Sequence, residues 1–308
     1  MIKKVQYNGW DAVELSNPSL TMVVTTSVGP RVICVKTPEG PNFMMNHPAQ
    51  QGLTGGEQWR IYGGHRLWHS PEADPRTYAP DNDPVDWKEI PGGIKLIQAV
   101  EKTTGLQKEI EIILDPASAK AVLTHRIYNR GYFDVEFAPW CLSVCAPGGV
   151  AYLPFAGKAR PNTFLNDRIL SLWPYTDLSD PRLGFRSSGV LLRQDPKATT
   201  PCKIGATSNY GWGAYVLGQE AFIKTIPVQS LESGSPVHPD NNVAWELYTC
   251  DLFLELETLG ALEKIAPGQF AQHQETWEFL PMSQTNDPRI SEIKAALPEW
   301  GGTSGKAF

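Results

Sequence analysis

The sequence is poor in positive charge and has no long apolar run. Its 27 Lys and Arg residues are outnumbered by 33 Asp and Glu, so the formal net charge is −6. With no basic stripe to neutralise phosphates, we expect no nucleic acid as a partner. No stretch of about 18 apolar residues is present, so we expect no membrane span, and the N-terminus has no signal-peptide pattern.

Cysteines are few and irregularly spaced, and no Cys-x-x-Cys pair occurs among Cys34, Cys141, Cys145, Cys202 and Cys250. An odd number at such spacing is typical of free thiols in a reducing compartment. Together with the missing signal peptide, this pattern predicts a cytoplasmic protein.

Several catalytic and cofactor motifs are also missing. The sequence has no Gly-x-Ser-x-Gly elbow, no phosphate loop and no dinucleotide fingerprint after a strand, so we expect no cofactor. His65 and His69 are four positions apart and would share a face on a helix. Because Gly63, Gly64 and Pro71 argue against a helix there, we predict no metal site.

The residues that are abundant favour strands and turns. The chain has 27 Gly and 26 Pro, only 19% charged residues and 41% hydrophobic residues, enough for a sizeable core. Short apolar or alternating segments, separated by turn residues, predict an all-β fold of packed antiparallel sheets with few short helices. The expected strands lie at 20–25, 31–35, 93–100, 107–114, 120–129, 135–144, 211–217, 220–225, 245–256 and 272–280.

The chain is expected to form a single domain over 1–308, because no linker divides it. Residues 283–308 are expected to form a C-terminal helical tail. Its helix should cover 287–297, since Asp287 is a suitable N-cap and Pro288 fits the first turn.

The segment from Tyr62 to Glu72 gathers the most polar chemistry, namely His65, Arg66, Trp68, His69 and Glu72. Its glycine pair, Gly63 and Gly64, allows close backbone approach or positive φ. We interpret the segment as one wall of a sugar pocket, with residues 73–86 as a loop that passes over it. The alternative is a strand end whose arginine pairs with a structural carboxylate.

A second polar cluster lies late in the chain. With a two-residue period, Asp251, Phe253, Glu255 and Glu257 share one face of a strand. Neighbouring carboxylates raise at least one pKa, which suits a general base. The alternative is a solvent-facing strand with scattered acids.

Aromatic side chains offer faces on which sugar C–H groups stack, and Trp59, Trp68, Trp140, Trp173 and Trp212 are candidates. The remaining histidines have simpler interpretations. His125 fits a packed, hydrogen-bonded core position, whereas His47 and His238 lie in loops. His273 precedes Glu275 on a strand and is a lesser candidate for the pocket.

Three groups of residues resemble galactose mutarotase-like proteins, and in particular a bacterial branch of that superfamily. They are Leu20–Val24 with Val28-Gly29-Pro30-Arg31-Val32, then Gly63-Gly64-His65-Arg66-Leu67-Trp68 with Pro71-Glu72, and finally Phe253–Glu257 with Leu262, Pro267-Gly268 and Glu275-Thr276-Trp277. The resemblance spans about residues 13 to 280. It implies a β-supersandwich of large antiparallel sheets with a sugar site on its concave face.

The resemblance also implies roles for single residues. In catalytic members a glutamate removes the proton of the anomeric hydroxyl, and Glu255 matches that position, with Glu257 as an alternative register. His65 or His69 falls near the first pocket histidine and would be the acid. Arg66 would hold sugar hydroxyls or a carboxylate, and the further substrate-binding candidates are Trp68, Glu72, Trp140 and Glu257.

One departure from the family pattern bears on catalysis. The acid histidine of the family usually lies on a middle strand, and the matching residues 135–144 contain no histidine. Either His65, His69 or His125 replaces it, or the protein binds sugar without this chemistry.

Three hypotheses follow, all with a small-molecule sugar or sugar acid as partner and with the oligomeric state open. The first is an aldose 1-epimerase-like isomerase that opens the sugar ring by general acid/base catalysis. The second is a carbohydrate-binding protein without turnover, and the third is a sugar lyase or other isomerase on the same scaffold. The sugar site requires the His-Arg-Leu-Trp run and the acidic strand to face each other across one hollow.

Overall fold

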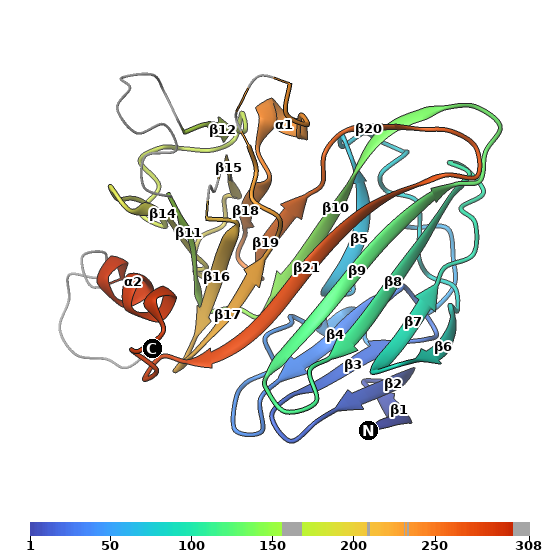
Figure 1. The fold of residues 1–308 in the computed structure, drawn as a ribbon, viewed down its shortest axis with the longest axis horizontal. Helices are drawn as coiled ribbons and strands as arrows, with labels where there is room; N and C mark the ends of the chain where they lie inside the picture. The colour runs from blue at the N-terminus through green and yellow to red at the C-terminus, as the bar shows by residue number, and fades with distance from the viewer. Residues whose placement is uncertain (156–167, 208–209, 231, 233, 298–308) are drawn as a thin grey trace.

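The computed structural model describes residues 1–155, 168–207, 210–230, 232 and 234–297. Within these residues, two large antiparallel sheets of 11 and 10 strands pack face to face (Figure 1). Strands make up 47% of the described residues and helices 6%, so the predicted all-β class is confirmed. The assignment of 1–308 to one domain stays a prediction.

The larger sheet has the strand order β1-β2-β3-β4-β5-β10-β19-β18-β15-β12, and β20 pairs with β10 off this path. Its strands are β1 (Ile2–Tyr7), β2 (Trp10–Ser16), β3 (Thr21–Thr25), β4 (Arg31–Lys36), β5 (Gly64–Ser70), β10 (Val135–Cys145), β12 (Leu170–Leu172), β15 (Cys202–Ala206), β18 (Trp245–Thr249), β19 (Leu254–Leu259) and β20 (Glu263–Ile265).

The smaller sheet has the order β13-β14-β11-β16-β17-β21-β9-β8-β7-β6. Its strands are β6 (Asp86–Ile90), β7 (Gly93–Ile97), β8 (Leu106–Leu114), β9 (Lys120–Asn129), β11 (Val150–Pro154), β13 (Leu183–Phe185), β14 (Gly189–Arg193), β16 (Trp212–Leu217), β17 (Glu220–Thr225) and β21 (Phe270–Pro281).

Helices are short: η1 covers Pro48–Gln50, α1 covers Pro239–Asn242 and α2 covers Pro288–Ala296. The helix predicted at 287–297 is confirmed as α2, and Asp287 caps it by accepting a hydrogen bond from the backbone N–H of Arg289. Residues 298–308 of the predicted tail lie outside the described residues. The helix packs its apolar side on the outer face of β11, β16 and β17 (Figure 1). Along the described residues, no helix is both long and apolar enough to span a bilayer.

The prediction of one long strand over 245–256 is wrong. The chain turns at residues 250–253 and forms the β18–β19 hairpin, because the backbone N–H of Cys250 donates to the carbonyl of Phe253 at 3.1 Å. Asp251 lies in this turn and is exposed, so it does not share a strand face with Glu255 and Glu257.

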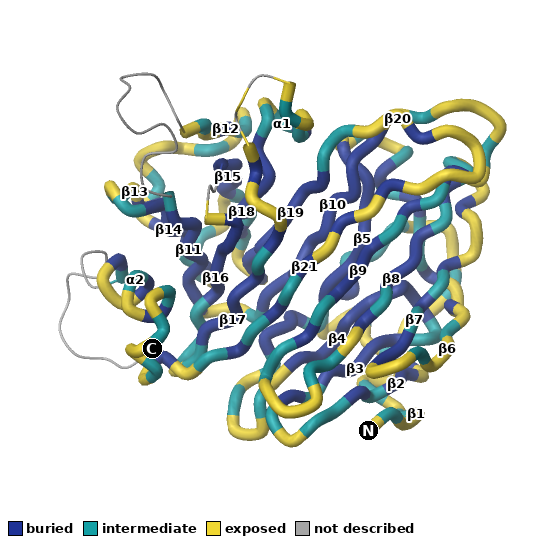
Figure 2. The backbone as a smooth tube through the Cα atoms, viewed as in Figure 1, coloured by how far each residue is buried: buried dark blue, intermediate teal, exposed yellow. Residues whose placement is uncertain are grey.

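Strand β21 shows the alternation that a half-buried strand requires. Its residues alternate between exposed and buried over Phe270–Glu275, and the inward positions are occupied by His273, Glu275 and Trp277. Strands β5, β10 and β19 differ, because nearly all of their residues are buried (Figure 2). An antiparallel sheet commonly leaves one face to water. Because both faces of these three strands are buried, side chains from other segments must cover their outer face.

The glycine pair before β5 lets this strand enter the sheet beside the preceding loop. Gly63 and Gly64 have φ values of +104° and +74°. A Cβ on Gly63 would lie 2.0 Å from the carbonyl oxygen of Met45, and one on Gly64 would lie 2.5 Å from that of Val32. Both positions therefore need glycine, as the sequence predicted.

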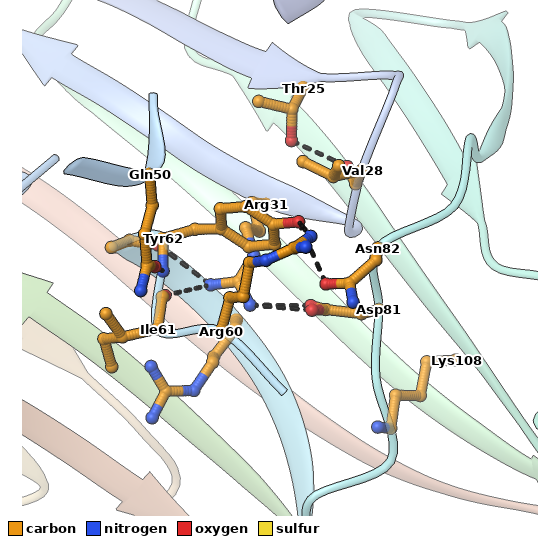
Figure 3. Close-up of polar contacts among 12 residues, drawn as sticks. Thr25, Val28, Arg31, Gln50, Arg60, Ile61, Tyr62, Asp81, Asn82 and Lys108 are labelled. Atoms are coloured by element: carbon orange, nitrogen blue, oxygen red, sulfur yellow. Dashed lines mark hydrogen bonds and ion pairs between the residues drawn. The ribbon is translucent and has the colours of Figure 1, made fainter. Parts of the chain in front are cut away.

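The start of β5 is held by a buried arginine from β4 (Figure 3). The Arg31 guanidinium donates to both carboxylate oxygens of Asp81 at 2.9 and 2.7 Å, and to the carbonyls of Ile61 at 3.0 Å and Gly63 at 2.9 Å. Asp81 belongs to the loop at 71–85. This one side chain therefore ties that loop to the entry of β5.

A polar network lies between the two sheets. His65 Nε2 is 2.8 Å from His125 Nε2, and His65 Nδ1 is 2.9 Å from the Ser143 hydroxyl. The Lys224 ammonium forms an ion pair of 2.9 Å with Glu275. Because all five side chains are fully buried, each polar group must find its partner inside the protein.

We predict that Arg31→Met lowers the free energy of unfolding by about 3–5 kcal/mol, because it leaves Asp81 without its partner in a half-buried place. Urea unfolding measures this change. The matched control is Arg126→Met, which breaks a more exposed ion pair with Glu111 and should cost no more than about 1 kcal/mol. Equal losses in the two variants would contradict the anchoring role of Arg31.

A second prediction concerns His69, which is fully buried and packs against Phe137. Burial lowers the pKa of this imidazole to about 3. Because the unfolded chain binds a proton near pH 6.5 and the folded protein does not, His69 makes stability fall as the pH drops below 6.5. Relative to wild type, His69→Phe should therefore gain about 2 kcal/mol of stability between pH 7 and pH 5. Parallel pH dependences of the two unfolding free energies would refute this.

Candidate functional site

The two faces of β5 carry different chemistry. Leu67 joins the core between the sheets, and His65 and His69, two positions before and after it, lie on the same face of the strand. Arg66 and Trp68 point to the other face, away from the smaller sheet. Trp68 joins a separate aromatic cluster that includes Trp140 of β10.

Strand register places the acidic residues of β19 beside this outer face. One row of directly paired residues runs Gly64, Val144, Glu255, Tyr248 and Lys203 across β5, β10, β19, β18 and β15. The next row on the same face runs Arg66, Leu142, Glu257, Glu246 and Gly205. The Arg-Leu-Trp run and the acidic strand, 189 positions apart from Arg66 to Glu255, therefore share one surface.

This surface is the floor of a cavity of about 410 Å³. Its walls are mostly aromatic, and they explain why the outer face of the sheet is buried here. The lining aromatic residues are Trp59, Trp68, Tyr78, Trp140, Trp173, Tyr175, Tyr248 and Phe253. Arg66, Glu72, Lys203 and Glu255 supply the charged groups of the lining. An apolar hollow with a few convergent polar groups is the usual form of a small-molecule site.

Arg66 and Glu255 form the central ion pair of the cavity. Arg66 Nη2 lies 3.1 Å from Glu255 Oε1, and the guanidinium stacks over Trp68 at 4.3 Å from the ring centroid. Burial raises the pKa of Glu255 to about 7, with the nearby charge of Glu257 adding to the effect and that of Arg66 opposing it. At neutral pH this carboxyl group is therefore divided between acid and base forms.

A second charged cluster occupies the adjoining part of the floor. Lys203 Nζ lies 2.7 Å from Glu246 Oε2 and 3.2 Å from Glu257 Oε2. The same ammonium is 4.7 Å from the ring centroids of Trp140 and Trp173. The Trp140 indole N–H also donates to Glu257 at 2.8 Å, so the cluster fixes the orientation of an aromatic wall.

Most of the sequence-predicted site residues come together here. Glu255, Arg66, Trp68, Trp140 and Glu72 line the cavity. Glu257 lies beside it and contacts two of the lining side chains. The loop at 73–86 also contributes, since the Tyr78 hydroxyl donates to Glu72 at the rim.

The two predicted acids, His65 and His69, do not line the cavity. They alternate with Arg66 and Trp68 along β5, so their imidazoles point into the space between the sheets. His65 contacts His125 and Ser143 there, and His69 packs on Phe137. Because side chains alternate between the two faces of a strand, the histidines lie on the opposite side of the sheet from Arg66 and Glu255. The sequence motif did not show which residues of β5 face the cavity.

Several lining residues were missed in the sequence. Lys203, Tyr78, Tyr175 and Tyr248 had no assigned role, and neither did Glu246, which lies outside the lining but pairs with Lys203. A usable signal exists for Lys203, because it interrupts the otherwise apolar strand Cys202–Ala206. A buried lysine in such a strand requires carboxylate partners, and Glu246 is one of them.

Among the described residues, two sets of side chains between the sheets have metal-ligand chemistry, and each set has its ligand atoms within 4.8 Å of one another. They are His65, His125 and Glu275, and Cys141, His273 and Glu275. The Glu275 charge is already matched by Lys224. The two imidazole nitrogens 2.8 Å apart are at hydrogen-bond distance, closer than two ligands of one tetrahedral zinc ion would lie.

A larger hollow of about 810 Å³ opens at the edge of the sandwich, between the β1–β2 and β6–β7 strand pairs. No aromatic side chain lines it, and its acidic residues Glu89 and Asp115 have no cationic side chain in the lining. The smaller cavity on β5, β10 and β19 has convergent charges and aromatic walls, so we take it as the candidate site.

No family model and no curated protein sequence matches the chain. Solved structures do match. A candidate aldose 1-epimerase from Klebsiella pneumoniae superposes over 96% of this chain and 85% of its own, with a TM-score of 0.62 and 13% identity. A galactose mutarotase-like protein from Lactobacillus casei matches over 87% of this chain and 100% of its own, with a TM-score of 0.52 and 9% identity.

A TPR-domain containing protein from Parabacteroides distasonis is also similar, with a TM-score of 0.56 and 12% identity over 88% of this chain. The match spans 47% of that protein, about half of its length. At these identities the likeness concerns the fold. It shows that the chain has a galactose mutarotase-like fold, as the sequence resemblance predicted.

Proposed function

We propose that the chain binds a free aldose in the cavity on β5, β10 and β19 and interconverts its anomers, as an aldose 1-epimerase-like isomerase. The observation that carries this proposal is Glu255, a buried carboxyl group with a pKa near 7 that faces an aromatic-lined hollow. A general base works best when its pKa lies near the working pH.

The chemistry assigned to Glu255 is removal of the proton from the anomeric hydroxyl. The O1 electron pair then forms the C1 carbonyl, the bond from C1 to the ring oxygen breaks, and the ring oxygen takes up a proton. Rotation about the bond from C1 to C2 and reclosure on the other face give the second anomer.

Neighbouring side chains have supporting roles in this proposal. Arg66 keeps Glu255 in place through their ion pair, and as a lining residue of the cavity it is assigned to sugar hydroxyls or a sugar carboxylate. Trp68 and Trp140 offer apolar faces to the C–H groups of the ring. Glu257 orients Trp140, and Glu72 with Tyr78 borders the opening.

A second candidate function is carbohydrate binding without turnover. It is favoured by one observation, that none of the described residues lining the cavity is a histidine. Under this alternative Glu255 and Arg66 are hydrogen-bonding groups for sugar hydroxyls, and no proton is transferred.

We predict that Glu255→Gln slows anomer interconversion by about 10²–10⁴-fold, the usual contribution of a general base. Polarimetry or NMR exchange with several aldoses measures the rate. In the wild-type protein the rate should rise with pH up to about 7, because only the deprotonated carboxylate accepts the proton.

The matched control is Glu111→Gln, which removes a carboxylate of β8 that pairs with Lys95 and Arg126 far from the cavity. It should keep the wild-type rate. Sugar binding without any rate above the protein-free control would support the binding-protein alternative. Neither binding nor rate with any aldose would refute both.

A further inference from the structure

The Lys203 cluster has more carboxyl groups than cations. One ammonium contacts Glu246 at 2.7 Å and Glu257 at 3.2 Å, and the two glutamates are direct neighbours across β18 and β19. Both glutamate side chains are fully buried, and Lys203 is only 4% exposed. Two carboxylates at this distance in a buried place do not both ionise against a single cation.

The cluster therefore keeps one proton beyond that of the ammonium. Burial raises the pKa of Glu246 well above its usual value, the charge of Glu257 raises it further, and that of Lys203 opposes them. Burial lowers the pKa of Lys203, but its carboxyl neighbours more than offset this, so the side chain stays an ammonium. Burial beside Glu257 therefore favours the protonated form of Glu246, next to the ammonium.

Lys203 is also the member of the cluster that reaches the cavity, since its side chain is part of the lining. An ammonium has three N–H donors, of which Lys203 donates one to Glu257 while Glu246 is its ion-pair partner. Lys203 and Glu255 lie in one strand row, two strands apart, which corresponds to about 10 Å between their Cα atoms. Long side chains from both positions can flank one anomeric carbon, to which both O1 and the ring oxygen are bonded.

We propose that Lys203 is the acid that protonates the ring oxygen, and that Glu246 resupplies its proton. This inference rests on the proposed anomer interconversion and assigns the acid that the cavity otherwise lacks. As Glu255 takes the O1 proton, the electron pair of the bond between C1 and the ring oxygen moves to that oxygen. The oxygen takes a proton from the Lys203 ammonium, and the amine takes one from Glu246. Reclosure runs the same transfers backwards, so no proton is gained or lost.

Other titratable groups face this cluster and share its pH dependence. Glu255 and Glu257 act on Lys203 from β19, Asp240 acts on Glu246 from α1, and Lys203 in turn acts on Tyr78, Tyr175 and Tyr248. Burial raises the pKa of Tyr248 to about 12, so that phenol stays protonated over the range in which the cluster is tested.

The experiment compares Lys203→Arg with Lys203→Met, with rates measured by NMR exchange. Arginine keeps the positive charge between the two glutamates, but its delocalised guanidinium does not act as a proton donor in proteins, whereas a lysine that transfers its proton recovers it from Glu246. We expect both variants to lose about 10²–10⁴-fold in kcat, the usual contribution of a positioned acid. We also expect Lys203→Arg to keep the thermal stability that Lys203→Met loses. A Lys203→Arg rate near that of wild type would overturn the proposal.

Glu246→Gln gives an independent readout that does not depend on the stability of the lysine variants. In wild type the rate should fall at alkaline pH as the cluster loses its extra proton. In Glu246→Gln the rate should already be low at neutral pH and this alkaline fall should be absent, because no Glu246 proton is present to be lost. An alkaline fall in rate that is the same in Glu246→Gln and wild type would overturn the role of Glu246.

If wild type itself shows no interconversion, the proposed function fails. An active wild type whose rate is unchanged in the Lys203 and Glu246 variants refutes only this inference.

Discussion

The ion pair between Arg66 and Glu255 is the contact on which the account depends. The two side chains are 189 positions apart in sequence and 3.1 Å apart in space. Each side chain is nearly fully buried, so each charge needs a partner of opposite sign. The strand register of β5, β10 and β19 places the two side chains in neighbouring rows on one face of the sheet. The same register encloses them with tryptophan and tyrosine side chains, and the cavity results.

The two faces of β5 divide the polar residues of the molecule into two sets. The outer set surrounds the cavity, where Arg66, Glu255 and Lys203 reach open space. The inner set, around His65, His125 and Glu275, is closed by its own hydrogen bonds and by Lys224. The inner set is a satisfied buried network of the type that holds two sheets in register. The outer set has polar groups that face a cavity and can act on a ligand.

Much of this arrangement could be predicted from the sequence, and the part that could not has a physical reason. The alternation of β8 and β9, the cap at Asp287 and the glycine pair are local signals, and each predicted its element. The convergence of Arg66 and Glu255 followed from the family resemblance. The face on which His65 and His69 lie depends on the register of β5, because a shift of one residue moves every side chain to the other face. A cluster of polar residues in the sequence does not determine that register. Lys203 was missed because its partners come from two other strands.

We propose that this cavity holds a sugar with its anomeric carbon at Glu255, and a crystal structure of the protein soaked with D-glucose or D-galactose tests this. We expect a pyranose between Trp68 and Trp140, with its anomeric hydroxyl within hydrogen-bond distance of Glu255 and its ring oxygen toward Lys203. A sugar bound elsewhere on the molecule, or a cavity free of sugar at saturating concentration, would contradict it.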